Sequence, residues 1–381
     1  MTRISADWLE CAEAQAVFSM LTEAGYQAYA VGGCVRNELL GAPVADVDLA
    51  SDARPETVMN LAEQAGLHPV PTGIEHGTIT VVSGGIGYEV TTFRKDVETD
   101  GRRAVIAFAD AVEQDAHRRD FTMNALYATA EGVLLDPLGG LDDLVKRRVR
   151  FIDDAGDRIR EDYLRILRFF RFHAWFGDPG GGIDPDALAA CAELAEGVDT
   201  LSKERVGTEI CKLLAAPDPA PSVAVMAQAG ILARILPGAI ANNLAPLIHL
   251  EGLAKTAPNW VRRLAALGGQ NVKDNLRMSR ADHRRFSLYR DHIAPQTGLS
   301  EIAYRHNAGS AVDVALLRAT LLDMPLEPDL HTSLTNASQQ VFPVRAADLS
   351  LKGAALGACL KSLEQSWIES GFRLTKAELL A

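Results

Sequence analysis

The sequence predicts an α+β protein in which a head with a small mixed sheet precedes an all-helical remainder. Short runs rich in β-branched and aromatic residues, bounded by Gly, Asp or Pro, mark strands in the first part of the chain. From Asp157 onward, long amphipathic helical patterns replace them, separated by turn-forming clusters. We therefore expect a head over residues 1–152, a helical neck over 153–240, and a helical body and tail over 241–381.

The elements of the head follow from local patterns in chain order. Helical periodicity covers Trp8–Ala24, a second helix begins near Cys34, and a third covers Pro55–Ala65 with proline at its start. The predicted strands are Ala28–Val31, Val47–Leu49, Thr78–Val82 and Tyr88–Phe93. A further helix is expected to begin at Arg118-Arg119-Asp120, with Phe121, Met123 and Leu126 in the core.

Composition places the chain among ordinary globular proteins. It has 381 residues, of which 48% are hydrophobic and 23% charged, so a disordered or fibrous protein is excluded. No apolar run approaches the ~18 residues of a membrane span, and the N-terminus lacks the pattern of a signal peptide. The five cysteines are scattered without a CxxC pair, which argues against a zinc site or a disulfide framework. We expect a cytoplasmic protein with free thiols.

The net charge of −12 argues against a protein that coats nucleic acid over its whole surface. It leaves room for a local basic surface, and arginine and lysine residues gather in the second half of the chain. We take Arg262, Arg263, Lys273, Arg277 and Arg284 as weak candidates for RNA phosphate contacts. The alternative is a charged, solvated helix face without a ligand.

The strand that ends at Gly32-Gly33 runs into a helix. Glycines let the backbone approach an anion closely, and a helix N-terminus offers free N–H groups to phosphate. Arg36 follows within reach of a bound triphosphate. A plain turn would account for the glycine pair equally well when it is considered alone.

Asp46 and Asp48 are separated by one residue in a predicted strand, so both carboxylates point to one face. Neighbouring carboxylates repel unless a cation lies between them, and Mg²⁺ with oxygen ligands and substrate phosphates is the expected occupant. Glu89, in the later strand, joins the pair if the two strands are neighbours. Three carboxylates around two Mg²⁺ ions would form a phosphoryl-transfer site, whereas solvated strand faces are the simpler alternative.

Polar residues recur every third position on a helix predicted over Glu161–Phe172. This ridge leaves Ile166, Leu167 and Phe170 for the core. Its polar members are Asp162, Arg165, Arg168 and Arg171. Ion pairs on a solvated face are the alternative interpretation. The polar, glycine-broken segment 96–103 is expected to form a loop, and His117 is expected to be structural, without a dyad partner.

Together these motifs resemble the class II branch of the polymerase-β-type nucleotidyltransferases, which holds bacterial CCA-adding tRNA nucleotidyltransferases and bacterial poly(A) polymerases. The blocks that carry the resemblance are 31–36, 46–50, 89–94, 118–125, 161–172 and 204–230, in the family's order. The resemblance implies that Asp46 and Asp48 bind metal, with Glu89 as a third catalytic carboxylate. It also implies a nucleotide-binding set consisting of Gly32, Gly33, Arg36, Arg119, Asp162, Arg165, Arg168 and Arg171. An ion pair with Asp115 or Asp120 is the alternative for Arg119.

The resemblance further implies template-independent addition of C-C-A to the 3′ end of tRNA from CTP and ATP, with release of pyrophosphate. Asp162 and Arg165 would then read the base, since carboxylate and guanidinium match the amine and acceptor that cytosine and adenine share. The implied cofactor is Mg²⁺, and the implied partners are the tRNA acceptor end, ATP and CTP, with no membrane and no protein partner. Alternatives are a poly(A) polymerase, an enzyme that adds only C-C or only A, a small-molecule nucleotidyltransferase, and a non-catalytic RNA-binding paralogue.

Overall fold

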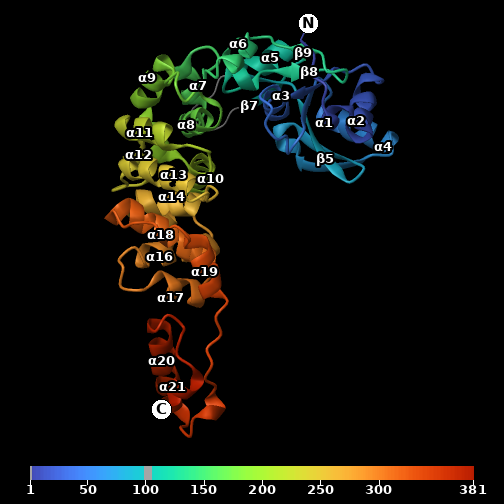
Figure 1. Ribbon diagram of the computed structural model, residues 1–381. Coiled ribbons are helices and arrows are strands. Elements are labelled where there is room, and N and C mark those ends of the chain that lie inside the picture. Colours follow the sequence, from blue (N-terminus) through green and yellow to red (C-terminus); the bar gives the residue numbers. More distant parts are fainter. Residues whose placement is uncertain (1, 98–104) are drawn as a thin grey trace. The chain divides into compact units, whose positions relative to one another are not determined.

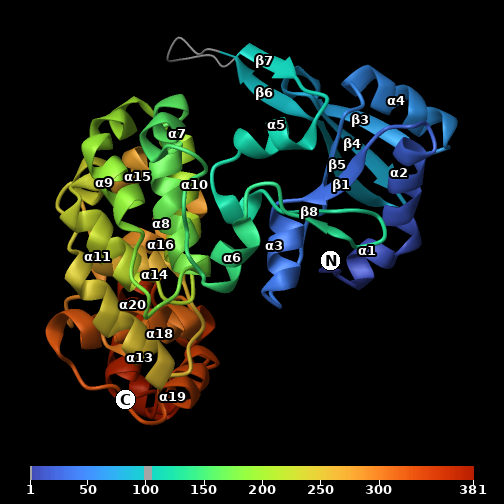
Figure 2. The same cartoon turned by 90° about the horizontal axis from the view of Figure 1, so that it is seen from above.

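The computed structural model describes residues 2–97 and 105–381 of the chain (Figures 1 and 2). It divides into two units, each with its own core. Unit 1 runs to Ser202 and includes Gln228–Ile231, and unit 2 consists of Lys203–Ala227 and Leu232–Ala381. The expected α+β head and helical remainder are confirmed. The finer division into head, neck and body stays a prediction.

A seven-stranded mixed sheet forms the centre of unit 1 within the described residues, in the order β3-β4-β5-β2-β1-β8-β9. Strand β2 lies antiparallel to β1 and parallel to β5, which places the two strands with predicted acidic residues side by side. The strands are β1 (Ala28–Val31), β2 (Asp48–Ser51), β3 (His68–Gly73), β4 (Thr78–Ser83), β5 (Ile86–Thr92), β8 (Tyr127–Ala128) and β9 (Leu134–Leu135).

The sequence predicts strands β1, β2, β4 and β5 of this sheet but not β3, β8 and β9. Strand β1 has the predicted bounds, and the bounds of β2, β4 and β5 differ from the prediction by at most two residues. The sequence of β3 contains Pro69 and Pro71, which indicate a loop, yet β3 is an edge strand, where a missing N–H is tolerated. Strands β8 and β9 are too short to carry a period-2 pattern.

Helices α2 (Ala12–Thr22) and α4 (Pro55–Gln64) pack against the sheet and against each other, as Figure 2 shows. The predicted first helix is interrupted, because α1 (Asp7–Glu10) is followed by Cys11, whose backbone is extended. The other helices of unit 1 are α3 (Gly33–Leu39), α5 (Val112–His117), α6 (Gly140–Val145), α7 (Ala155–Glu161), α8 (Leu164–Phe176) and α9 (Pro185–Glu193).

Two helix predictions require correction. The helix expected to begin at Arg118 does not form, since α5 ends at His117 and only the 3-10 turn Thr122–Asn124 follows, although Phe121, Met123 and Leu126 are buried as expected. The helix expected over Glu161–Phe172 is divided between α7 and α8. Asp162 has an extended backbone at the break, and its Oδ1 accepts a hydrogen bond from the Leu164 N–H at 3.1 Å. Aspartate bonds to its own backbone in this way in turns, which competes with helix formation.

A separate two-stranded antiparallel sheet consists of β6 (Arg94–Val97) and β7 (Val105–Phe108). Most of the loop predicted over 96–103 lies outside the described residues. Its first two residues, Asp96 and Val97, belong to β6, so the loop prediction began too early.

Unit 2 is helical throughout its described length. Its main core gathers apolar residues of α13, α14, α17 and α18, including Leu247, Val261, Ile302 and Leu317. A second cluster around Trp367 joins α20 and α21. The helices are α10 (Lys203–Leu214), α11 (Ala220–Gln228), α12 (Ile231–Ile235), α13 (Leu244–Leu253), α14 (Trp260–Leu267), α15 (Val272–Asn275), α16 (Arg280–Asp291), α17 (Leu299–Arg305), α18 (Ala308–Leu322), α19 (Leu330–Ser338), α20 (Gly353–Glu369) and α21 (Lys376–Leu380).

Among the described residues, no helix combines the length and the apolar character needed to cross a membrane.

Candidate active site

The carboxylates of the head meet at one place on the sheet. Asp48 lies directly opposite Glu89 in the parallel pairing of β2 with β5, so the two side chains share one face. Asp46 is exposed and precedes β2 by two residues, so the expectation that it lies in the same strand as Asp48 is wrong. Burial, together with the charges of Glu89 and Asp46, raises the pKa of Asp48 to about 6, although Arg119 acts in the opposite direction. The charges therefore lie close enough to repel one another.

This donor set fits a divalent cation that is shared with a substrate. Within the described residues, no group of three or more His, Cys, Asp or Glu side chains could by itself hold a metal ion. Mg²⁺ is usually bound by one or two carboxylates together with substrate phosphates, which is what Asp46 and Asp48 could provide. A cation here would also relieve the repulsion that raises the pKa of Asp48.

The backbone conformation at Gly32 favours glycine over any other residue. Its φ of +72° disfavours residues with a side chain, and a Cβ there would lie 3.4 Å from Nη1 of Arg119. Gly33 is the first residue of α3. The glycine pair therefore allows the backbone to pass close to a guanidinium on the carboxylate side of the sheet.

Arg119 is held in a buried group with Asp115 and Tyr127. Its Nε and Nη2 donate to Asp115 Oδ2 at 3.1 and 2.8 Å, and Nε also donates to the Tyr127 hydroxyl at 3.0 Å. Burial would raise the pKa of Asp115, but Arg119 and Arg118 outweigh it and hold that pKa at about 2. The expected ion pair with Asp115 is thus present, and it fixes Arg119 while Nη1 lies beside Gly32.

Arg36, expected near the triphosphate, has a largely buried guanidinium. Its Nη1 donates to Asn124 Oδ1 at 2.5 Å, and its charge lies 4.0 Å from the ring centroid of Phe176 on α8. Burial, followed by the neighbouring charges of Arg171 and Arg168, lowers the pKa of Arg36 to about 10. It stays charged at neutral pH, at a considerable electrostatic cost.

Helix α8 contributes further arginines to the same region. The guanidinium carbons of Arg36, Arg168 and Arg171 lie 5.1, 5.4 and 4.7 Å from the ring centroid of Phe172. Arg168 also donates from Nε to Asp120 Oδ2 at 2.7 Å. Asp120 offsets part of this positive charge through its ion pair with Arg168. A group of three guanidiniums around one ring still suits an anionic ligand such as a nucleotide triphosphate.

Arg165 is fixed at the junction of α7 and α8. Its Nη1 donates to Glu161 Oε2 at 2.5 Å and to the Arg158 carbonyl at 2.9 Å, while Nη2 donates to the Arg118 carbonyl at 3.1 Å. Asp162 lies at the break between the helices, one turn from Arg165. The break places Asp162 outside the helical ridge that the sequence predicts, and its base-reading role stays a prediction.

His117 has a partner that the sequence did not indicate. Its Nδ1 lies 2.8 Å from Asp153 Oδ2, at a residue with a positive φ of 55°. The expectation that His117 lacks a dyad partner is therefore wrong. The two residues are 36 positions apart, and no local pattern connects them.

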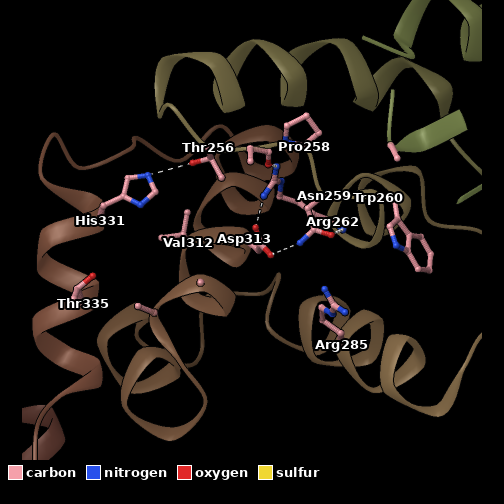
Figure 3. A pocket seen from close by; sticks show the side chains of 14 residues that line it. Thr256, Pro258, Asn259, Trp260, Arg262, Arg285, Val312, Asp313, His331 and Thr335 are labelled. Atoms are coloured by element: carbon pink, nitrogen blue, oxygen red, sulfur yellow. Dashed lines mark hydrogen bonds and ion pairs between the residues drawn. The ribbon is translucent and has the colours of Figure 1, made fainter. Parts of the chain in front are cut away.

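Two of the arginines expected to contact RNA lie in the interior of unit 2. Arg262 and Arg263 are each 1% exposed, and both donate to Glu251. Arg262 also pairs with Asp313, as Figure 3 shows, and Arg263 donates to the carbonyls of Leu214 and Ala216. The expectation of RNA contacts at these two positions is replaced by a structural role.

The other basic candidates are at the surface of unit 2. Lys273, Arg277 and Arg284 are exposed, and Arg277 lies 3.3 Å from Glu204. Their RNA contacts stay a prediction.

Two protein-family models match parts of this chain. A family model described as "Poly A polymerase head domain" matches residues 28–150, and one described as "Probable RNA and SrmB- binding site of polymerase A" matches residues 182–242.

Curated relatives and a solved structure resemble nearly the whole chain. The chain is 31% identical to the Homo sapiens protein "CCA tRNA nucleotidyltransferase 1, mitochondrial", over 92% of this chain and 85% of the relative. It is 33% identical to a "CCA-adding enzyme" of Streptococcus sanguinis, over 94% of both chains. The crystal structure of the Bacillus stearothermophilus CCA-adding enzyme in complex with CTP superposes with a TM-score of 0.75 at 29% identity, over 94% of this chain and 93% of that one.

Proposed function

Because this chain belongs to the family of CCA-adding tRNA nucleotidyltransferases, we propose that it adds C, C and A to the 3′ end of tRNA from CTP and ATP. In each addition the terminal 3′-oxygen loses its proton to solvent and forms a bond to the α-phosphorus. The bond between the α-phosphorus and the oxygen that bridges to the β-phosphate breaks, and pyrophosphate leaves. No nucleic-acid template is required, because protein side chains select the base.

The observation that carries this proposal is the position of Asp48 opposite Glu89, with Arg119 and the Gly32 turn beside them. Carboxylates for a cation and a guanidinium for phosphates gather at the central strands β1, β2 and β5 of the mixed sheet. We propose Mg²⁺ as the cation, held by Asp46 and Asp48 with Glu89 next to them. When bound, it would lower the pKa of the attacking hydroxyl and neutralise charge on the leaving pyrophosphate.

The protein's own groups bind and orient the nucleotide. Arg36, Arg168 and Arg171 surround Phe172 and would attract the triphosphate. Arg119 is rigid because Asp115 and Tyr127 hold two of its nitrogens, so it can meet a phosphate at little further entropic cost.

Asp162 and Arg165 are proposed to read the base. Asp162 would accept from the exocyclic amine that cytosine and adenine share, and Arg165 would donate to the adjacent ring acceptor. Glu161 and two backbone carbonyls hold Arg165 in place before substrate arrives, which favours selection by a rigid surface.

We propose that the exposed Lys273, Arg277 and Arg284 of unit 2 contribute phosphate contacts to tRNA. We also propose that the protein acts in the cytoplasm, because the five cysteines are free, as in a reducing compartment.

Nucleotide omission tests the proposed function. A tRNA transcript that ends at the discriminator base is incubated with Mg²⁺ and CTP alone, ATP alone, or both, and the products are sized. We expect two additions with CTP and a third only when ATP is also present. A ladder of A residues with ATP alone would identify a poly(A) polymerase, and a halt after C-C with both nucleotides would identify a partial enzyme.

A further inference from the structure

We propose that Asn124 is a positioning residue for nucleotide addition, because its side-chain amide links Arg36, behind the Gly32 turn, to Asp120, which holds Arg168 on α8. This inference rests on the proposed function. It adds a link between the part of the site that would hold the triphosphate and the helix next to the base-reading residues.

A continuous series of side-chain contacts connects three parts of unit 1. Arg168 on α8 donates from Nε to Asp120 Oδ2 at 2.7 Å, and Asn124 donates from Nδ2 to Asp120 Oδ1 at 2.8 Å. Arg36 on α3 then donates from Nη1 to Asn124 Oδ1 at 2.5 Å. Asn124 therefore uses its donor on one side and its acceptor on the other.

Burial makes this link specific. Arg36, Asp120 and Asn124 are each 7% exposed, so water cannot readily replace a lost contact. The orientation of the amide is fixed as well, because the NH₂ group must face the carboxylate and the oxygen must face the guanidinium. A flipped amide would place two acceptors together and two donors together.

The neutral amide also preserves the charge of Arg36. A carboxylate in its place would form an ion pair with Arg36 and lie beside Asp120, another carboxylate. It would thereby cancel part of the positive charge that Arg36, Arg168 and Arg171 gather around Phe172. An asparagine positions the guanidinium without neutralising its charge.

The link has a consequence for base selection. Arg168 lies one helical turn from Arg165 on α8, and Arg36 lies one turn from Gly32. A contact that joins α3 to α8 sets the distance between the phosphate end and the base end of the nucleotide. Small displacements between such groups have large effects on rate and selection.

The Asn124→Ala variant tests the link through nucleotide affinity and base selection. We expect the KM for CTP to rise about tenfold or more, the change expected when contacts to charged groups are lost. Incorporation of UTP relative to CTP should rise by a similar factor, because the hydrogen-bonded link between α3 and α8 is lost and the two helices are then joined directly by the contacts of Arg36 with Phe172 and Phe176. The turnover number for CTP should change less than KM.

The Asn37→Ala variant is the matched control. Asn37 Oδ1 accepts from Nε and Nη2 of the same Arg36 at 3.2 and 2.9 Å, but Asn37 has no part in the contact between Asp120 and Arg168. We expect this variant to raise the KM for CTP and to leave the ratio of UTP to CTP incorporation at the wild-type value. An equal loss of base selection in both variants would overturn the proposed link.

The Asn124→Asp variant keeps the shape of the side chain and changes its charge, so it separates the effect of side-chain position from that of charge. It also keeps the test valid if thermal unfolding shows that Asn124→Ala is not folded. We expect it to raise the KM for CTP more than Asn124→Ala does. Wild-type KM and selection in a folded Asn124 variant would overturn the inference. CTP binding at equilibrium without tRNA tests the role of Asn124 in nucleotide affinity without requiring catalysis. A wild-type protein that binds CTP and fails to extend tRNA would therefore contradict the proposed function alone.

Discussion

Asp48 and Glu89 lie opposite one another on two neighbouring parallel strands, although they are 41 positions apart along the chain. The pairing of β2 with β5 brings the later carboxylate to the earlier one, and burial then makes their mutual repulsion costly. Charges in this arrangement are typical of a site that binds a cation together with an anionic substrate.

Gly32 allows Arg119 to approach the backbone, and Gly32→Ala should therefore affect both stability and nucleotide binding. A side chain at φ +72° is strained, and the added Cβ would lie 3.4 Å from Nη1 of Arg119. We expect the free energy of unfolding to fall by about 1–3 kcal/mol and the KM for CTP to rise. Thermal unfolding and initial-rate kinetics measure the two effects.

Gly25→Ala provides the control for backbone strain. Gly25 has a φ of +86°, and no described atom lies within 4 Å of a Cβ built there. It should lose stability through strain and keep the wild-type KM for CTP. If Gly32→Ala shows an unchanged KM as well, the close approach to Arg119 has no part in nucleotide binding.

Asp115 should make stability depend on acid pH. Its pKa is about 2 in the folded protein, below the ordinary value of 3.8, because Arg119 and Arg118 outweigh its burial. A depressed pKa contributes stability that is fully present above the unfolded value and is lost as pH falls toward the folded value. We expect the wild type to exceed Asp115→Asn by a few kcal/mol near neutral pH, with the advantage shrinking from about pH 4 toward pH 2. Urea unfolding across this range measures it, and a constant difference would contradict the assignment.

The buried and the exposed basic residues of unit 2 should differ in how much they contribute to stability. Arg262→Ala would leave the buried Asp313 with an uncompensated charge, so the free energy of unfolding should fall by about 3–5 kcal/mol. Lys273→Ala, at an exposed position, should change stability by less than about 0.5 kcal/mol.

An exposed basic residue that contacts tRNA is recognised by the effect of its removal on tRNA affinity. Lys273→Ala should weaken binding and reduce the slope of log affinity against log salt by about one. An unchanged slope would show that Lys273 does not contact a phosphate.

Local patterns in the sequence were sufficient for the head's central strands and for the acidic residues that those strands bring together. Asp46, Asp48 and Gly32 lie in short segments with clear chemistry, and the position of Glu89 depended on one assumption about strand neighbours, which the sheet satisfies.

Partners far apart in sequence could not be predicted. Arg262 has the same local appearance as a surface arginine, and only the folded chain shows Glu251 and Asp313 beside it. The role of Asn124 depends on Arg36, 88 residues away. The helix break at Asp162 was within reach, since aspartate favours turns, but the apolar period on both sides concealed it.

The most direct test of the account compares Asp48→Asn with the wild type in a single-turnover reaction. Enzyme in excess over a tRNA ending at the discriminator base is mixed with saturating CTP and Mg²⁺, and the first C addition is timed. The variant keeps the shape of Asp48 and removes its charge, so we predict a rate at least about a thousandfold lower, with unchanged tRNA affinity. A wild-type rate in this variant would contradict the assignment of nucleotide addition to the Asp48 site.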